Sequence, residues 1–128
     1  MTEEAKATPR PTDIVLHRKS RELEVAFDSG ERFRMGAEYL RVHSPSAEVR
    51  GHGRGQEILQ VGKENVGIRN VEPVGSYAVR LVFDDGHDSG IYSWSQLYRL
   101  GREHDENWAR YLQRLAEAGV QRHRQAGD

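Results

Sequence analysis

The chain has 128 residues, which is enough for one domain with a modest hydrophobic core and too short for two. Its 19 basic and 20 acidic residues give a net charge of -1, so no overall positive field would attract nucleic acid or acidic membranes, and neither is expected as a partner. The absence of cysteine excludes disulfides, thiolate metal sites and cysteine nucleophiles.

Residues 1–13 are polar, contain two prolines, and are predicted to form a disordered lead-in. This segment lacks the apolar stretch of a signal peptide. No apolar run in the chain approaches the ~18 residues of a membrane span. We therefore expect a cytoplasmic protein.

Three short strands are predicted next, at residues 14–17, 22–27 and 31–35, separated by polar turns. Apolar and charged side chains alternate along the second and third of them. This alternation predicts a β-meander with one face toward the core and the other toward solvent.

The alternation stops at residue 37, and residues 37–43 are predicted to form a short helix that ends before Ser44-Pro45. Residues 46–60 then form an irregular loop in which glycine recurs at positions 51, 53 and 55. Strand character resumes over residues 66–71, and a turn is predicted at Pro73 and Gly75.

Residues 77–94 read as a β-hairpin with Asp85-Gly86 in a tight type I′ turn. This turn pairs Val79 with Tyr92 and Asp84 with His87. One face of the predicted hairpin is apolar and comprises Tyr77, Val79, Leu81, Phe83, Tyr92 and Trp94.

Two helices are predicted after the hairpin. Ser93 or Ser95 would cap the first, which Gly101 would stop; Asp105 would cap the second, which Gly119 would end. A polar tail follows at residues 120–128. The whole predicts an α+β fold for a single domain at residues 14–119. Its mostly antiparallel β-sheet, a meander plus a hairpin, is covered by the C-terminal helices, with a short helix and an irregular loop inserted mid-chain.

Two segments, LRVHSPSAEVRGHG at residues 40–53 and FDDGHDSGIYSWSQLYRLG at residues 83–101, resemble the gamma-butyrobetaine hydroxylase-like N-terminal domain. That family is otherwise catalogued as a domain of unknown function, and the resemblance covers roughly residues 13–118. In the hydroxylases this domain precedes an oxygenase domain that holds iron and 2-oxoglutarate. No counterpart of the oxygenase domain is expected here, so its catalytic activity does not transfer.

The resemblance also implies that one region of this domain corresponds to a zinc site. The related domains hold a structural zinc through three cysteines and one histidine, which match Ser44, Ser46, Val49 and His87 here. Since serine hydroxyls are poor zinc ligands, we expect the zinc site to be lost. A similar domain is appended to some P-loop ATPases that carry iron-sulfur clusters, and this association implies a link to iron or iron-sulfur metabolism.

His87 is open to two interpretations, as a remnant metal ligand or as a hairpin residue hydrogen-bonded to Asp84 or Asp85. A metal site would use the four candidate ligands His43, Glu48, His52 and His87. Imidazole and carboxylate groups suit iron or zinc, which are the cofactors left open.

A partner surface would use the four basic residues Arg41, Arg50, His52 and Arg54. The leading hypothesis is a non-catalytic accessory domain that binds an unidentified protein partner through residues 41–56 and the neighbouring hairpin edge. A metal-binding module is the alternative hypothesis. The basic segment could also be a solvated loop that binds no partner. An enzyme would require a concave pocket with strongly shifted ionisable groups, and no catalytic residue is predicted.

Overall fold

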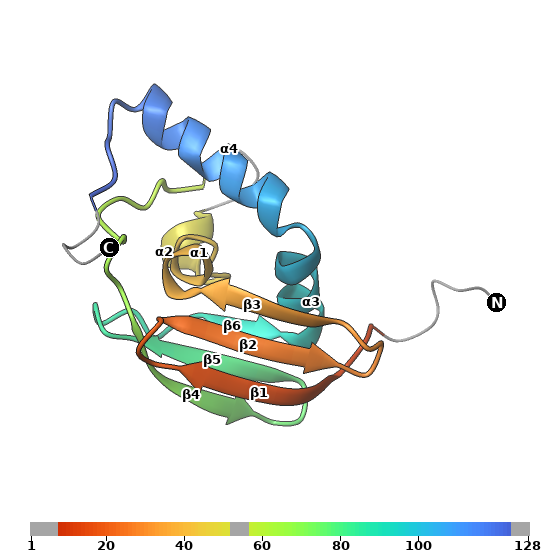
Figure 1. Ribbon diagram of the computed structural model, residues 1–128. Coiled ribbons are helices and arrows are strands. Elements are labelled where there is room, and N and C mark those ends of the chain that lie inside the picture. The colour runs from red at the N-terminus through yellow and green to blue at the C-terminus, as the bar shows by residue number, and fades with distance from the viewer. Residues whose placement is uncertain (1–7, 52–56, 124–128) are drawn as a thin grey trace.

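The computed structural model describes residues 8–51 and 57–123. Within these residues the chain forms two three-stranded antiparallel sheets, with strand orders β1-β2-β3 and β4-β5-β6. Figure 1 shows the sheets one behind the other and the helices gathered beyond β3 and β6, with α4 outermost. The predicted α+β class is confirmed, although the strands divide into two sheets.

The elements follow one another in chain order. The first sheet contains β1 (Pro11–His17), β2 (Glu22–Phe27) and β3 (Arg32–Gly36). The second contains β4 (Ile68–Val74), β5 (Ala78–Phe83) and β6 (Ile91–Ser93). The helices are α1 (Ala37–Val42), α2 (Ala47–Arg50), α3 (Trp94–Arg102) and α4 (His104–Glu117).

One hydrophobic core joins both sheets to α1 and α3. Its fully buried members include Leu23, Met35, Leu40, Leu81, Phe83, Tyr92 and Leu97. A smaller cluster under α4 contains Val42, Tyr111 and Leu115, with Val120 packed against it. Neither sheet could bury its apolar face alone, so the two sheets pack together through this shared core. Their packing determines which loops lie next to one another at the end of the molecule.

Proline placement accounts for two boundary errors in the sequence-based prediction. Strand β1 begins at Pro11, inside the predicted lead-in, and pairs Pro11 with Phe27. Pro73 lies within β4 opposite Val79, although it was predicted in a turn. Both β1 and β4 are edge strands, where a residue without an N–H group is tolerated.

The register of β5 with β6 is as predicted, with Val79 opposite Tyr92, but the predicted pair of Asp84 with His87 is wrong. The type I′ turn is wrong. Gly86 has a φ of 94° while Asp85 is not in the left-handed region, and Phe83 N donates to His87 O at 3.0 Å. The loop therefore has three residues, 84–86, with glycine supplying the single positive φ. Tyr77 was placed on the apolar face, but it precedes β5 and is 61% exposed.

Helix α3 begins as predicted, because Ser93 forms a capping box with Gln96. It continues through Gly101, which was predicted to stop it. An ideal Cβ on Gly101 would lie 2.5 Å from the Phe33 ring. Phe33 packs edge-on against Tyr98 with ring centroids 6.1 Å apart. Glycine at 101 therefore permits the close approach of β3 to α3.

We predict that Gly101→Ala lowers the free energy of unfolding. Alanine gains about 1 kcal/mol of helix propensity, but forcing a methyl group against the Phe33 ring costs about 1–3 kcal/mol. In a Phe33→Leu background, where the ring is absent, the same change should stabilise the protein. Urea unfolding of the four proteins measures both effects; stabilisation in both backgrounds would contradict this explanation.

The start of α4 and the chain that follows it also differ from the prediction. Asp105 lies in the first turn of α4 and does not cap it; Glu103 precedes the helix and forms no side-chain cap. Gly119, with a φ of 73°, lies just beyond its end as predicted. Beyond it, Val120 and Arg122 contact the domain, so residues 120–123 are part of the packed structure. No helix among the described residues is long and apolar enough to cross a membrane.

Candidate functional site

The segment predicted as an irregular loop begins with a short helix that lies against the hairpin turn. Ser46 caps α2 by accepting a hydrogen bond from Glu48 N at 3.2 Å. Ser46 Oγ also lies 2.7 Å from Ser89 Oγ, beyond the hairpin turn. The core therefore brings residues 44–50 and 84–89 together, although about 40 positions separate them in the sequence.

A buried hydrogen-bond chain joins these two segments. His87 Nε2 lies 2.9 Å from Ser44 Oγ, and His87 Nδ1 lies 2.9 Å from Glu48 Oε1. Ser44 is 1% exposed, whereas the Glu48 side chain is 70% exposed. The chain thus runs from the core to the surface, with the imidazole as its middle member.

The environment of His87 favours the neutral ring. Burial lowers the pKa of His87, and the nearby Arg41 charge lowers it further, while the Glu48 carboxylate acts in the opposite direction. A neutral ring that donates from Nδ1 to Glu48 accepts at Nε2 from the Ser44 hydroxyl. Ser44 Oγ in turn accepts a hydrogen bond from Ser46 N at 3.2 Å.

A serine, a histidine and a carboxylate in this order resemble the arrangement that activates a nucleophilic serine. A nucleophile must reach its substrate, and Ser44 Oγ is enclosed by the protein. An ideal Cβ on Gly90 would lie only 2.4 Å from Ser44 Oγ, which shows how tightly the hairpin covers it. We therefore assign a structural role to the hydrogen bonds among Ser44, His87 and Glu48, which fasten α2 to the hairpin.

The positions that match the zinc ligands of the related domains meet at this place. Ser44, Ser46 and His87 form the hydrogen bonds described above, and Val49 is buried. Hydrogen bonds and one apolar side chain therefore stand where the resemblance implies a metal. His87 does serve its hairpin, but through its backbone, because His87 N donates to Asp85 Oδ1 at 3.0 Å.

The structure does not assemble the four predicted metal ligands. His87 and Glu48 are in contact, but His43 turns to another surface, where its Nδ1 lies 2.9 Å from Tyr39 O. His52 lies outside the described residues. No group of three or more histidine, aspartate and glutamate side chains that could hold a metal occurs in the described part of the chain. The metal-binding module is thus not supported.

Arg41, one of the predicted partner-binding residues, is buried in an ion pair. Its Nε lies 2.9 Å from Asp85 Oδ2, and Lys63 Nζ lies 2.7 Å from the same oxygen. Burial acts to raise the pKa of Asp85, but the hydrogen bonds from Lys63, His87 N and Arg41 outweigh it and lower the pKa to about 2. Arg41 therefore holds the hairpin turn and is not available at the surface.

Arg50 does lie at the surface, beside a groove between α2 and α4. The groove has a volume of about 520 Å³, and its charged rim includes Arg50, Arg110, Arg114 and Glu57. A second hollow of about 400 Å³ shares Arg50 and His43 with it and adds Arg99. Arg54, the remaining predicted residue, lies outside the described residues.

The pKa of His43 is affected by the positive charge of this groove. Burial lowers the pKa of His43, its bond to Tyr39 O opposes the change, and the charges of Arg110 and Arg114 lower it further. Sequence reasoning missed both arginines. They are four residues apart on α4, where like charges repel and destabilise a helix slightly. Such a pair is a signal that could have drawn attention to this face.

Three solved structures are similar to this chain. Two proteins described by solution NMR are 46% and 51% identical to it; each match covers 95% of this chain, with TM-scores of 0.79 and 0.78, and 98% and 90% of the other protein. A crystal structure from Acidithiobacillus ferrooxidans ATCC 23270, of a DUF971 family protein of unknown function, is 40% identical, with a TM-score of 0.61, and the match covers 72% of this chain and 92% of that protein. No curated protein matches.

The family comparison covers most of the folded chain. The family described as gamma-butyrobetaine hydroxylase-like, N-terminal matches residues 14–98, from β1 into α3. The matched range includes the segment at residues 40–53, all but the last three residues of the segment at 83–101, and both halves of the Ser44–His87 contact. The chain therefore belongs to the gamma-butyrobetaine hydroxylase-like N-terminal domain family.

Proposed function

We propose that this domain is a non-catalytic interaction module that binds an acidic segment of a partner protein in the groove between α2 and α4. One observation carries the proposal: Arg50 from α2 and Arg110 and Arg114 from α4 surround a single hollow of about 520 Å³. Opposite charge on a partner would be steered toward this rim. The link to iron metabolism stays a prediction from the resemblance.

The charges on this rim are largely uncompensated. Within residues 8–51 and 57–123, Arg50, Arg99 and Arg114 form no ion pair, and Arg110 lies 3.8 Å from Glu106 with both side chains exposed. Exposed pairs of this kind contribute at most about 1 kcal/mol, so Glu106 is readily exchanged. Glu57 adds one negative charge to the rim. Three arginines against one carboxylate still favour an anion.

The groove also has an apolar lining, supplied by Val42, Val49, Ile58 and Tyr111. Ile58 is exposed, while Val42, Val49 and Tyr111 are buried beneath the rim. A cationic rim above an apolar floor suits a segment in which acidic residues alternate with large apolar ones. Apolar contact supplies affinity and the charges supply orientation, as is usual at such interfaces.

We predict that Arg50→Glu/Arg114→Glu weakens binding of a fluorescein-labelled peptide of alternating glutamate and leucine by about tenfold or more. Two charge reversals on the rim need to remove only about 1.4 kcal/mol for that change. Fluorescence anisotropy at low salt measures the dissociation constant. The same variant should lose native-lysate partners that the unmodified protein retains.

The matched control is Lys19→Glu/Arg69→Glu, which makes the same change in net charge at two exposed positions away from the groove. It should bind the peptide like the unmodified protein. Equal weakening by both double variants would mean that net charge alone matters. Equal binding by all three proteins would remove the groove as the docking site.

A further inference from the structure

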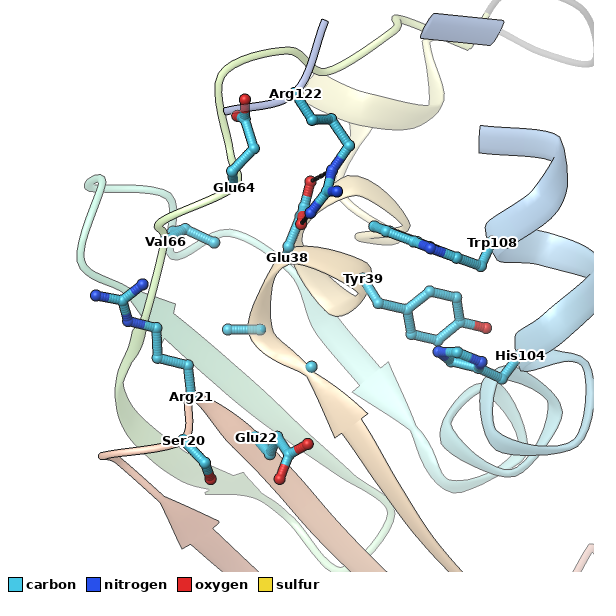
Figure 2. Close-up of a pocket in the computed structure, with 12 residues that line it drawn as sticks. Ser20, Arg21, Glu22, Glu38, Tyr39, Glu64, Val66, His104, Trp108 and Arg122 are labelled. Carbon is cyan, nitrogen blue, oxygen red and sulfur yellow. Dashed lines mark hydrogen bonds and ion pairs between the residues drawn. The ribbon is translucent and has the colours of Figure 1, made fainter. Parts of the chain in front are cut away.

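A second pocket lies on the other side of α1, below the C-terminal residues of the described chain (Figure 2). Its volume is about 230 Å³, and its lining includes Glu38, Tyr39, Glu64, Trp108 and Arg122. Figure 2 shows the Arg122 side chain reaching down from the 120–123 segment to Glu38, with Trp108 and Tyr39 on the side of α4. The pocket already holds one cation, from the chain itself.

Two kinds of contact hold the Arg122 guanidinium. Its Nε donates to Glu38 Oε2 at 2.8 Å, and its Nη2 donates to Glu38 Oε1, so the pair is bidentate. The guanidinium carbon also lies 5.1 Å from the centre of the Trp108 ring. The hydrogen bond to Glu38 is the main reason that the pKa of Arg122 is raised. A planar fork on a carboxylate and a cation over an indole are the features that recognise arginine.

Three of the residues that line the pocket, Glu38, Tyr39 and Trp108, belong to α1 and α4 and not to the segment that carries Arg122. Glu38 lies in the first turn of α1, and its side chain is 9% exposed with Arg122 in place. Tyr39 packs edge-on against Trp108, with ring centroids 6.3 Å apart. When Arg122 leaves, the Glu38 carboxylate faces a hollow next to an indole ring, an arrangement that favours another cation.

The segment that carries Arg122 is attached at few points. It follows Gly119, beyond the end of α4. Among the described residues, and outside the Arg122 contacts, it is held by packing of Val120, by Val120 N, which donates to Leu115 O at 2.9 Å, and by His123 N, which donates to Glu64 Oε2. Segments with so few contacts open at lower free energy than the core. Glu64 and Glu22 also line the pocket, and Glu22 is paired with Arg34 at 2.8 Å. Arg21 lines it too, with its guanidinium pointing away from Trp108 in Figure 2.

We propose that this pocket is an arginine-binding site for a partner protein, and that Arg122 occupies it until a partner's arginine replaces it. The bidentate contact with Glu38 selects a guanidinium over the ammonium group of lysine. The net negative lining that remains once Arg122 leaves attracts a basic segment, whereas the α2–α4 groove attracts an acidic one. The two sites are separate, so either proposal can fail without the other.

The test compares binding of N-acetyl-arginine methylamide to the unmodified protein and to Arg122→Gln, which removes the guanidinium and its charge but keeps the first part of the aliphatic stem. The indole N–H signal of Trp108 and tryptophan fluorescence report on occupancy. Removal of the intramolecular competitor should lower the dissociation constant at least about tenfold, because a tethered group competes at a high effective concentration. N-acetyl-lysine methylamide should bind about tenfold more weakly.

Arg122→Gln/Glu38→Gln provides the control, since it lacks both charges and should lose the response. Equal binding by the unmodified protein and Arg122→Gln, or equal binding of the lysine and arginine probes, would overturn the proposal. Arg122→Lys is the second variant if Arg122→Gln does not fold, and it should also bind the arginine probe more tightly than the unmodified protein. If neither variant folds, Arg122 is an indispensable structural residue and not an exchangeable occupant.

Discussion

Asp85→Ala is expected to lower the free energy of unfolding by about 3–5 kcal/mol, because it leaves the buried Arg41 guanidinium without its ion-pair partner. Among the described residues, Arg41 then keeps its hydrogen bond to Gln60 Oε1, at 3.1 Å. The substitution also removes the acceptor for Lys63 Nζ and for His87 N. Chemical unfolding in urea at pH 7 measures the change.

Asp88→Ala is the matched control in the same hairpin. The Asp88 side chain is 56% exposed and lies 3.6 Å from Arg80, so its removal should change stability by no more than about 1 kcal/mol. Asp85→Asn should fall between the two, since an amide oxygen can still accept from Arg41. If Asp85→Ala were as mild as Asp88→Ala, the buried ion pair would not stabilise the fold.

The lowered pKa of Asp85 also predicts how the stabilisation by this ion pair is lost at acid pH. Its pKa is about 2 in the folded protein, below the ordinary value of 3.8. A carboxyl with a depressed folded-state pKa contributes stability that is fully present above the unfolded value. That contribution is lost as the pH falls from about 4 through 2, and Asp85→Ala should lack this part of the acid dependence.

The hairpin shows how far local sequence determines this fold. Alternation of apolar residues and the Asp85-Gly86 pair were enough to give the register of β5 and β6. They did not give the loop, because Asp85 is held by Arg41 and Lys63 from other parts of the chain. Similarly, Gly101 looks like a helix stop until Phe33 is known to lie against it. Contacts distant in sequence decided both cases.

The residues of the candidate site also divide into those that local sequence indicates and those that only contacts distant in sequence reveal. Arg50 was identified from the basic mid-chain segment and does lie at the groove. Arg41 is in the same segment, yet its helix turns it toward Asp85 and buries it. Arg110 and Arg114 were missed because the sequence of α4 shows only that its apolar stripe is buried. Their place in the groove depends on the position of α2, which the sequence does not give. The sequence alone pointed to Arg50 on one wall of the groove, and it gave no indication of the wall formed by α4.

The Ser44–His87–Glu48 chain leads to the last prediction. The resemblance implies a metal that would fasten these segments; here the two hydrogen bonds of one imidazole do so. His87→Ala should lower the free energy of unfolding by about 2–4 kcal/mol, since it leaves Ser44 unsatisfied and opens a cavity. Glu48→Gln, at an exposed position that keeps an acceptor oxygen, should cost less than about 1 kcal/mol.

The pH dependence separates the titration of His87 from its packing. The pKa values of His87 and His43 are both lowered in the folded protein, chiefly by burial, from an ordinary value of 6.5. The unfolded chain therefore binds protons first as the pH falls, and stability declines below about 6.5. His87→Gln should flatten the decline between pH 7 and pH 5, and His87→Gln/His43→Gln should flatten it further. An unchanged slope in His87→Gln would show that His87 is not neutral inside the fold and does not accept the hydrogen bond of the Ser44 hydroxyl.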